Sequence, residues 1–142
     1  MALAAAQVVD VLAARIAAQA TLGAGGVRTS RTWPWAEADL PACRIYAVDE
    51  QVELVTQDPI NAHTMGVDVQ YTVRATADLD DAMHVQASAG LALLFAGARP
   101  YGLQHTGISR DPATEGEAAV GRITLQLSTL FHVAPAAPET IL

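Results

Sequence analysis

Four histidines are the first candidates for acid–base or metal chemistry in this sequence, and they are widely separated. They are His63, His84, His105 and His132. None stands in an HExxH motif or in another spacing typical of metal ligands. Imidazoles placed in this way are more simply explained as surface or partly buried side chains.

Serine, cysteine and carboxylate side chains also lack a catalytic motif. The serines show no GxSxG pattern, and Cys43, the single cysteine, stands in no local nucleophile signature. Asp78, Asp80 and Asp81 crowd into four residues. They begin a predicted helix, where carboxylates favour the positive end of the helix dipole without any ion. The sequence therefore predicts no catalytic residue, no metal, no cofactor and no enzyme activity.

Length and composition favour one acidic domain. The chain has 142 residues, enough for one core. Its net charge of −7 comes without any lysine or basic cluster, which argues against direct nucleic-acid binding. A single cysteine excludes an internal disulfide and fits a reducing, cytoplasmic setting. No long uncharged apolar run predicts a membrane span. Residues 1–20, interrupted by Asp10 and Arg15, are expected to belong to the mature protein.

Two amphipathic helices are predicted. The first covers about residues 4–22 and ends at a glycine-rich run. The second begins at Asp78 as its N-cap, reaches about Ala96 and is closed by Gly97. The apolar stripe of the first helix consists of Val8, Val9, Leu12 and Ile16.

Two long strands are predicted from strict alternation of apolar and polar side chains. They cover residues 65–75 and 123–133, and each should bury one face. The first is long enough to project as an arm at one end. Shorter strands are predicted at residues 27–32, 42–48, 51–56 and 103–109.

The predicted connections are a turn at Asp49-Glu50 and a mobile, mostly acidic loop over residues 110–121. Residues 1–133 form one domain, and residues 134–142 are rich in proline and expected to be extended or disordered. Alternating strands and short connections favour antiparallel pairing. The predicted fold class is therefore α+β, a two-layer sandwich of a mainly antiparallel sheet covered by two helices.

The stretch between residues 28 and 46 concentrates residue types that are enriched at protein interfaces. It holds both tryptophans and three arginines, and such residues dominate binding hot spots. Nearby carboxylates offer partners on another copy of the chain. In the alternative interpretation, the tryptophans cover the core of their own subunit. The candidate interface consists of Arg28, Arg31, Trp33, Trp35, Glu37, Asp39, Arg44, Glu50 and Glu53.

The segment EADLPACRIY, from Glu37 to Tyr46, resembles a motif of the lambda-type tail terminator, or tail completion, proteins of long-tailed bacteriophages and related tail-like particles. The shared features are Glu-x-Asp, Pro-Ala and the final tyrosine. The likeness continues up to Val133 in the order of elements, from an opening helix through an acidic turn and the long strand to a last alternating strand. The Trp33-Pro34-Trp35 turn and the tail after Val133 do not match the family.

This resemblance implies a structural virion protein without catalytic residues or cofactor. Tail terminators form hexameric rings that dock on the last ring of the tail tube, stop its polymerisation and present the surface that head-completion, or connector, proteins join. The implied location is the neck region of the virion tail, after assembly in the host cytoplasm. A negatively charged ring would repel DNA phosphates, so the genome is expected to pass through its lumen without specific binding.

Two other functions remain open from the sequence. Another neck protein, such as the stopper on the head side of the joint, shares small size and ring assembly. A ligand-binding or enzymatic α+β oligomer would instead use a cleft near Tyr101, His105 and the acidic loop.

Overall fold

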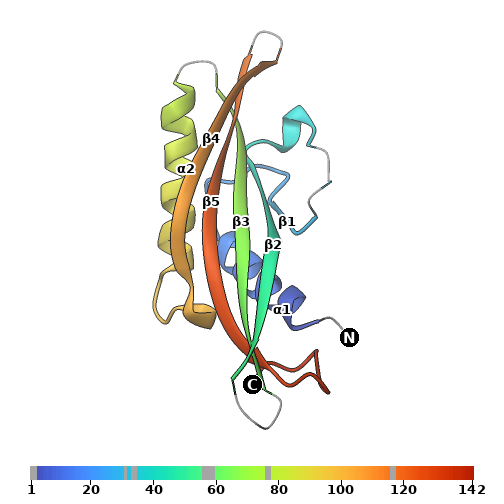
Figure 1. Cartoon of the computed structure of the whole chain (residues 1–142). Helices are drawn as coiled ribbons and strands as arrows, with labels where there is room; N and C mark the ends of the chain where they lie inside the picture. Colours follow the sequence, from blue (N-terminus) through green and yellow to red (C-terminus); the bar gives the residue numbers. More distant parts are fainter. Residues whose placement is uncertain (1–2, 31, 33–34, 56–59, 76–77, 116–117) are drawn as a thin grey trace.

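A two-layer α+β sandwich confirms the predicted fold class. The computed structural model describes residues 3–30, 32, 35–55, 60–75, 78–115 and 118–142. Two helices pack on one face of a long five-stranded sheet (Figure 1). The helical segments are α1 (Ala4–Ala17), α2 (Leu79–Leu94) and the short 3-10 turns η1 (Glu37–Asp39) and η2 (Pro100–Gly102). The strands are β1 (Val27–Arg28), β2 (Ala42–Leu54), β3 (Asn61–Ala75), β4 (Gln104–Glu115) and β5 (Ala118–Val133).

The strands are arranged in the order β1-β2-β3-β5-β4. Neighbouring strands are antiparallel, as predicted, except that the short β1 runs parallel to β2. β3 and β5 pair along the centre of the sheet, from Asn61 opposite Val133 to Ala75 opposite Ala119. The sheet therefore ends in two unlike edges. One is β4, and the other is β1 together with the part of β2 that β1 does not cover.

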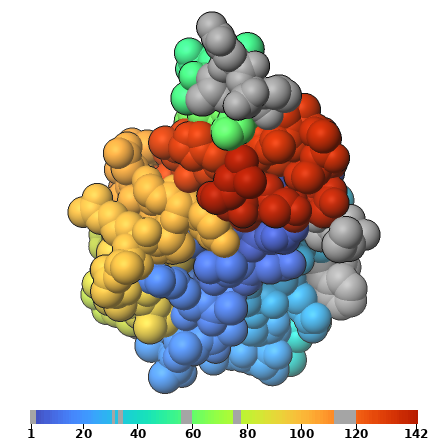
Figure 2. All heavy atoms as spheres, turned by 90° about the horizontal axis from the view of Figure 1, so that it is seen from below, coloured from blue at the N-terminus to red at the C-terminus, as the bar shows by residue number. Residues whose placement is uncertain are grey.

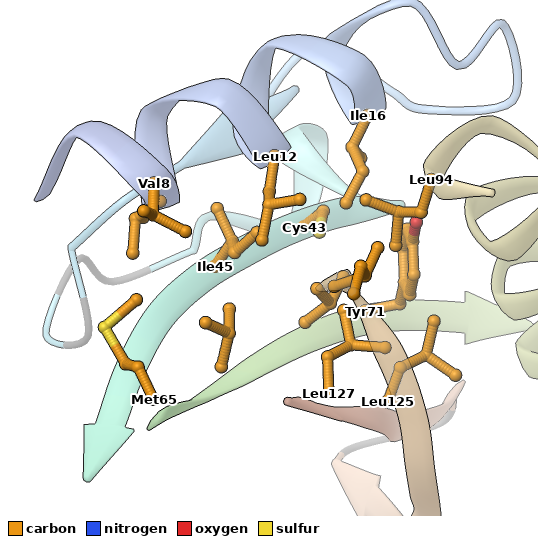
Figure 3. Packing of buried hydrophobic residues seen from close by; sticks show 14 of the residues in the cluster. Val8, Leu12, Ile16, Cys43, Ile45, Met65, Tyr71, Leu94, Leu125 and Leu127 are labelled. Atoms are coloured by element: carbon orange, nitrogen blue, oxygen red, sulfur yellow. The ribbon is translucent and has the colours of Figure 1, made fainter. Parts of the chain in front are cut away.

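The core lies on the helix-covered face of the sheet, and the alternation predicted for β3 is confirmed. The buried apolar side chains of β3 are Met65, Val67, Val69, Tyr71 and Val73, and the polar Thr72 on the other face is buried as well. The predicted stripe of α1 is also buried, with Val8, Leu12 and Ile16 pointing toward the strands (Figure 3). Burial of apolar area on this face is the main stabilising term of the fold.

A hydrogen-bonded polar cluster lies inside this core, between the end of α1, β3 and α2. The Tyr71 hydroxyl donates to Oε1 of Gln19 (2.8 Å), and Nε2 of Gln19 donates to Oε1 of Gln86 (2.8 Å). Thr21 completes the cluster, since its hydroxyl donates to Oε1 of Gln86 and its carbonyl accepts from Nε2 of Gln86. Buried polar groups are tolerated when they are bonded in this way.

The helix boundaries differ slightly from the prediction. α1 ends at Ala17, before the predicted Leu22, because the chain turns at Gln19 and directs that side chain into the polar cluster. The predicted N-cap of α2 is confirmed, since Oδ1 of Asp78 accepts from the backbone N–H of Asp81 (3.0 Å). That bond and the helix dipole account for the carboxylates at the start of α2.

The predicted turn at Asp49-Glu50 is wrong. β2 continues through these residues without a chain reversal, and a register shift between Ala47 and Glu50 marks a β-bulge. No glycine or proline stands there to reverse the chain, and a bulge absorbs the extra residue while the strand continues. Asp49 lies across Gly66 of β3, where a Cβ atom would come within 2.6 Å of the Asp49 carboxylate.

The predicted mobile loop over residues 110–121 is also wrong, because most of it forms strand. β4 extends to Glu115 and β5 begins at Ala118, so that the two strands make a hairpin. Pro112 lacks an amide hydrogen, but it is tolerated because β4 is an edge strand. At the other end of the sheet, β1 covers only Val27–Arg28 instead of residues 27–32.

Cys43 is fully buried on β2 beneath α1, and burial raises the pKa of its thiol (Figure 3). Because the thiolate is the reactive form, we expect Ellman's reagent to leave the folded protein unlabelled and to modify one thiol per chain after unfolding in guanidinium chloride. Rapid labelling without denaturant would show that the packing of α1 on β2 opens readily.

Candidate interface surfaces

Trp35 packs against its own chain at the start of β2. The Arg44 guanidinium lies 5.3 Å from the centroid of the Trp35 ring, within the range of a cation–π contact. Gly25 makes room for the ring, since a Cβ atom there would lie 2.9 Å from Cζ3 of Trp35. This contact joins Trp35 to the sheet within one subunit. The side chain is only partly buried, so part of it is still open to solvent.

Three carboxylates of the candidate interface have partners in the same chain. Glu37 forms an ion pair with Arg74 of β3. Oδ2 of Asp39 accepts from the backbone N–H of Ala36 (2.9 Å). The third, Glu50, bonds to Nδ1 of His63. Exposed ion pairs such as Glu37–Arg74 contribute about 0–1 kcal/mol, so this partner can be exchanged at small cost when another chain binds.

The structure does not bring the nine candidate residues together in one patch. Arg28, Trp35, Glu37, Asp39 and Arg44 lie around β1, η1 and the start of β2, whereas Glu50 and Glu53 lie toward the other end of β2. Arg44 and Glu53 are about 30 Å apart along the strand. Arg31 and Trp33 lie outside the described residues. A single contiguous interface made of all nine residues is therefore not supported by the positions of the described ones.

Four of the exposed large apolar side chains lie at the end of the β2–β3 hairpin. Every residue from Val48 to Val55 is exposed. In Figure 1 this end of the hairpin extends past the helices, and in Figure 2 it protrudes at one side of the molecule. This projecting end pairs residues 51–54 of β2 with residues 61–64 of β3, so it lies beyond the strand 65–75 for which an arm was predicted. The exposed apolar side chains are Val48 (47%), Val52 (55%), Leu54 (64%) and Val55 (52%).

A groove of about 300 Å³ lies at the base of this hairpin. It is bounded by the start of α1, by Val52 and His63 on the two strands, and by the C-terminal tail. His63 stacks on Phe131 of β5, with ring centroids 5.2 Å apart. The groove is mostly apolar, and its polar side chains include the paired Glu50 and His63.

The C-terminal tail forms one wall of the groove. Instead of extending away, it turns back so that Ile141 bridges Val133 and the Leu142 N–H donates to the His132 carbonyl (2.9 Å). The backbone N–H of Ala4 donates to the carbonyl of Pro138 (3.1 Å), which ties the tail to the start of α1. The start of α1 and the C-terminal tail therefore both lie beside the groove at the base of the hairpin.

The surface around His105 is where the alternative function, a ligand-binding or enzymatic oligomer, would place its site. The His105 ring bonds to the carbonyl of Gly107 (3.0 Å) on its own strand, at the second register shift of the sheet. Next to it, Nε of Arg110 donates to Nε2 of His84 on α2 (3.1 Å). In the described part of the chain, no group of three or more His, Cys, Asp or Glu side chains is placed to hold a metal ion.

None of the described helices is long and apolar enough to cross a membrane. No protein-family model matches the sequence, and a search of curated proteins finds no match.

Proposed function

We propose that this protein assembles with copies of itself into a ring that caps the tail tube of a long-tailed bacteriophage or a related particle. The ring ends tube polymerisation and offers the surface that head-completion proteins join. The resemblance of Glu37–Tyr46 and of the element order to tail terminators supports this function. The α+β fold agrees with that order, except that Asp49-Glu50 forms a bulge where the likeness has a turn.

The exposed apolar end of the β2–β3 hairpin is the observation that carries the proposal. Isolated apolar side chains are normal on a surface, but several exposed apolar side chains on one projecting element mark a contact with a partner. Val52, Leu54 and Val55 are each more than half exposed. A second copy of the chain or a tube subunit would bury them, and burial of this area stabilises the assembly.

Assembly into a ring needs two different surfaces on each copy, because each subunit contacts its two neighbours through unlike patches. The sheet supplies two unlike edges, with β2 near one side and β4 at the other. A patch that paired only with itself would stop at a dimer. The topology therefore suits head-to-tail assembly.

Sedimentation velocity should show assembly of the purified chain into a hexamer, and the assembled ring should shorten tubes formed by its tube protein. Replacing Leu54 and Val55 together by serine should weaken assembly by about tenfold, because about 1.4 kcal/mol of apolar burial is lost. The circular dichroism of the monomer should not change, since both side chains are exposed.

Val11→Ser is the matched control, because Val11 is exposed on α1, away from the hairpin end. A chain that stays monomeric even in the presence of tube subunits would contradict the proposal. Particles made without this protein would separate the terminator from the stopper: overlong, headless tails indicate a terminator, and filled heads that leak DNA indicate a stopper.

A further inference from the structure

We propose that the free edge of β2 in one copy pairs with the free edge of β4 in the next copy, as antiparallel strands with Val52 opposite Ile108. This inference deepens the proposed function, on which it rests, by assigning the contact between subunits. The partner of each edge is therefore a second copy of this chain.

Both edges are open over matching lengths. Among the described residues, β1 pairs with β2 only at Cys43 and Arg44, and β2 is exposed from Val48 to its end. In the described part of the chain, β4 pairs with β5 and with no other strand. Its residues 104–111 are exposed apart from the partly buried Gly107. Open edges of this length are templates for an added strand unless they are blocked.

The strand directions favour antiparallel pairing between copies. β2, β3, β5 and β4 are joined by three antiparallel steps, so β2 and β4 of one copy run in opposite directions. Rotation about a ring axis that lies along the strands preserves the direction of each strand. The β4 edge of one copy then meets an oppositely directed β2 edge of the next.

The faces of the two edges also match. Glu50 and Val52 lie on the helix-covered face, because they line the groove beside α1. Ile108 lies on the same face of the sheet, since it is opposite the buried Leu125. Arg110 does too, since it contacts His84 of α2. If both copies keep their helices on one side, these side chains must meet each other across the new edge.

One register satisfies both the apolar and the charged side chains. With Val52 opposite Ile108, Glu50 comes opposite Arg110 and Gln51 opposite Ser109. A shift of two residues in either direction would place Glu50 beside Ile108 or Val52 beside Arg110. Cross-strand apolar and opposite-charge pairs stabilise a sheet, and mismatched pairs do not.

Irregularities in both strands limit the ladder to this segment. The bulge of β2 lies between Ala47 and Glu50, and the register shift of β4 lies between His105 and Gly107. Pro112 has no amide N–H to donate. The regular residues between these limits are those that the proposed register pairs.

Paired cysteines test the register directly. Val52→Cys with Ile108→Cys should give a ladder of covalent oligomers under mild oxidation, because opposed strand residues lie within disulfide range. Each single variant should give no ladder. Val52→Cys with Arg110→Cys, which is offset by two residues on the same face, is the matched control and should cross-link at least about tenfold less. Cys43 is buried and should not interfere.

Charge reversal gives an independent readout. Glu50→Arg alone and Arg110→Glu alone should each weaken assembly by about tenfold, and the two together should restore it. Glu50→Arg also removes the Glu50–His63 bond within one chain, and the double variant does not repair that bond. Recovery of assembly in the double variant would therefore show a contact between copies.

Sedimentation of the reduced protein distinguishes the possible failures. A hexamer without the Val52–Ile108 ladder and without charge rescue would overturn the edge pairing and leave the ring function standing. A chain that remains monomeric with tube subunits present would overturn both. A ladder from the offset pair that equals the ladder from the proposed pair would overturn the register.

Discussion

Replacing Gly90 by alanine is expected to lower the free energy of unfolding by about 3 kcal/mol. A Cβ atom at this position of α2 would lie 2.8 Å from Cζ of Tyr71 and closer still to its hydroxyl oxygen. Tyr71 cannot move aside freely, because its hydroxyl is bonded to Gln19. In an open helix, the same change would be stabilising by about 1 kcal/mol. In Gly90→Ala, the gain in helix propensity therefore opposes the steric clash with Tyr71. Because the clash costs more, the free energy of unfolding should fall.

Urea denaturation followed by circular dichroism measures this effect. Ser88→Ala, at an exposed position of the same helix, should stay within about 0.5 kcal/mol of the original protein. Adding Tyr71→Phe to Gly90→Ala should cost less than the sum of the two single changes, because the hydroxyl that meets the new methyl group is gone. A Gly90→Ala protein of unchanged stability would mean that α2 does not pack this closely on β3.

The core was predictable from the sequence because one physical rule places each of its members. Strand side chains alternate between two faces, so the apolar positions of β3 had to share one covered face. The stripe of α1 follows from helical spacing in the same way. Both predictions are confirmed, and together they determine the two-layer architecture.

The bulge and the second hairpin could not be read in this way, since they depend on pairing between distant residues. Asp49-Glu50 has the composition of a turn, but β3 offers a partner for almost every residue on both sides of it. Residues 110–121 have the composition of a loop, yet β5 supplies a continuous ladder. Cross-strand pairing overrides local preference at both places.

Residue type and nearness in sequence define the candidate interface, and neither determines position on a long strand. Because β2 is continuous, it carries Arg44 and Glu53 to opposite parts of the molecule. The exposed apolar residues of the hairpin were missed, although their signal was present: valine and leucine at successive positions of a segment that also holds three carboxylates. Such a segment has too many charges to be buried in the core of one subunit.

In the proposed ring, assembly and folding depend on separate parts of the chain. The side chains that close the core lie beneath the helices, whereas β2 beyond Val48 contributes exposed residues. Substitutions at the hairpin end and at the β4 edge should therefore change assembly while the stability of the monomer stays the same. Substitutions in the polar cluster should lower the stability of the monomer and leave the contacts between copies unchanged.

Replacing Gln19 by leucine is expected to lower the free energy of unfolding by about 3 kcal/mol, because it leaves a buried hydroxyl without its acceptor. In the native protein, the Tyr71 hydroxyl donates to Oε1 of Gln19 (2.8 Å), and Nε2 of Gln19 donates to Oε1 of Gln86. Leucine at position 19 can make neither bond. Leucine adds apolar burial, but an unsatisfied polar group in a packed core costs more than one side chain of this size returns.

Urea denaturation again measures the free energy of unfolding. The matched control is Gln126→Leu, at an exposed position on the uncovered face of the sheet. The free energy of unfolding of this control should change by no more than about 0.5 kcal/mol. Combining Gln19→Leu with Tyr71→Phe removes both donor and acceptor, so the double variant should recover part of the lost stability. If Gln19→Leu were as stable as the original protein, the Tyr71 hydroxyl would have to find another acceptor, and the polar cluster would not be needed for folding.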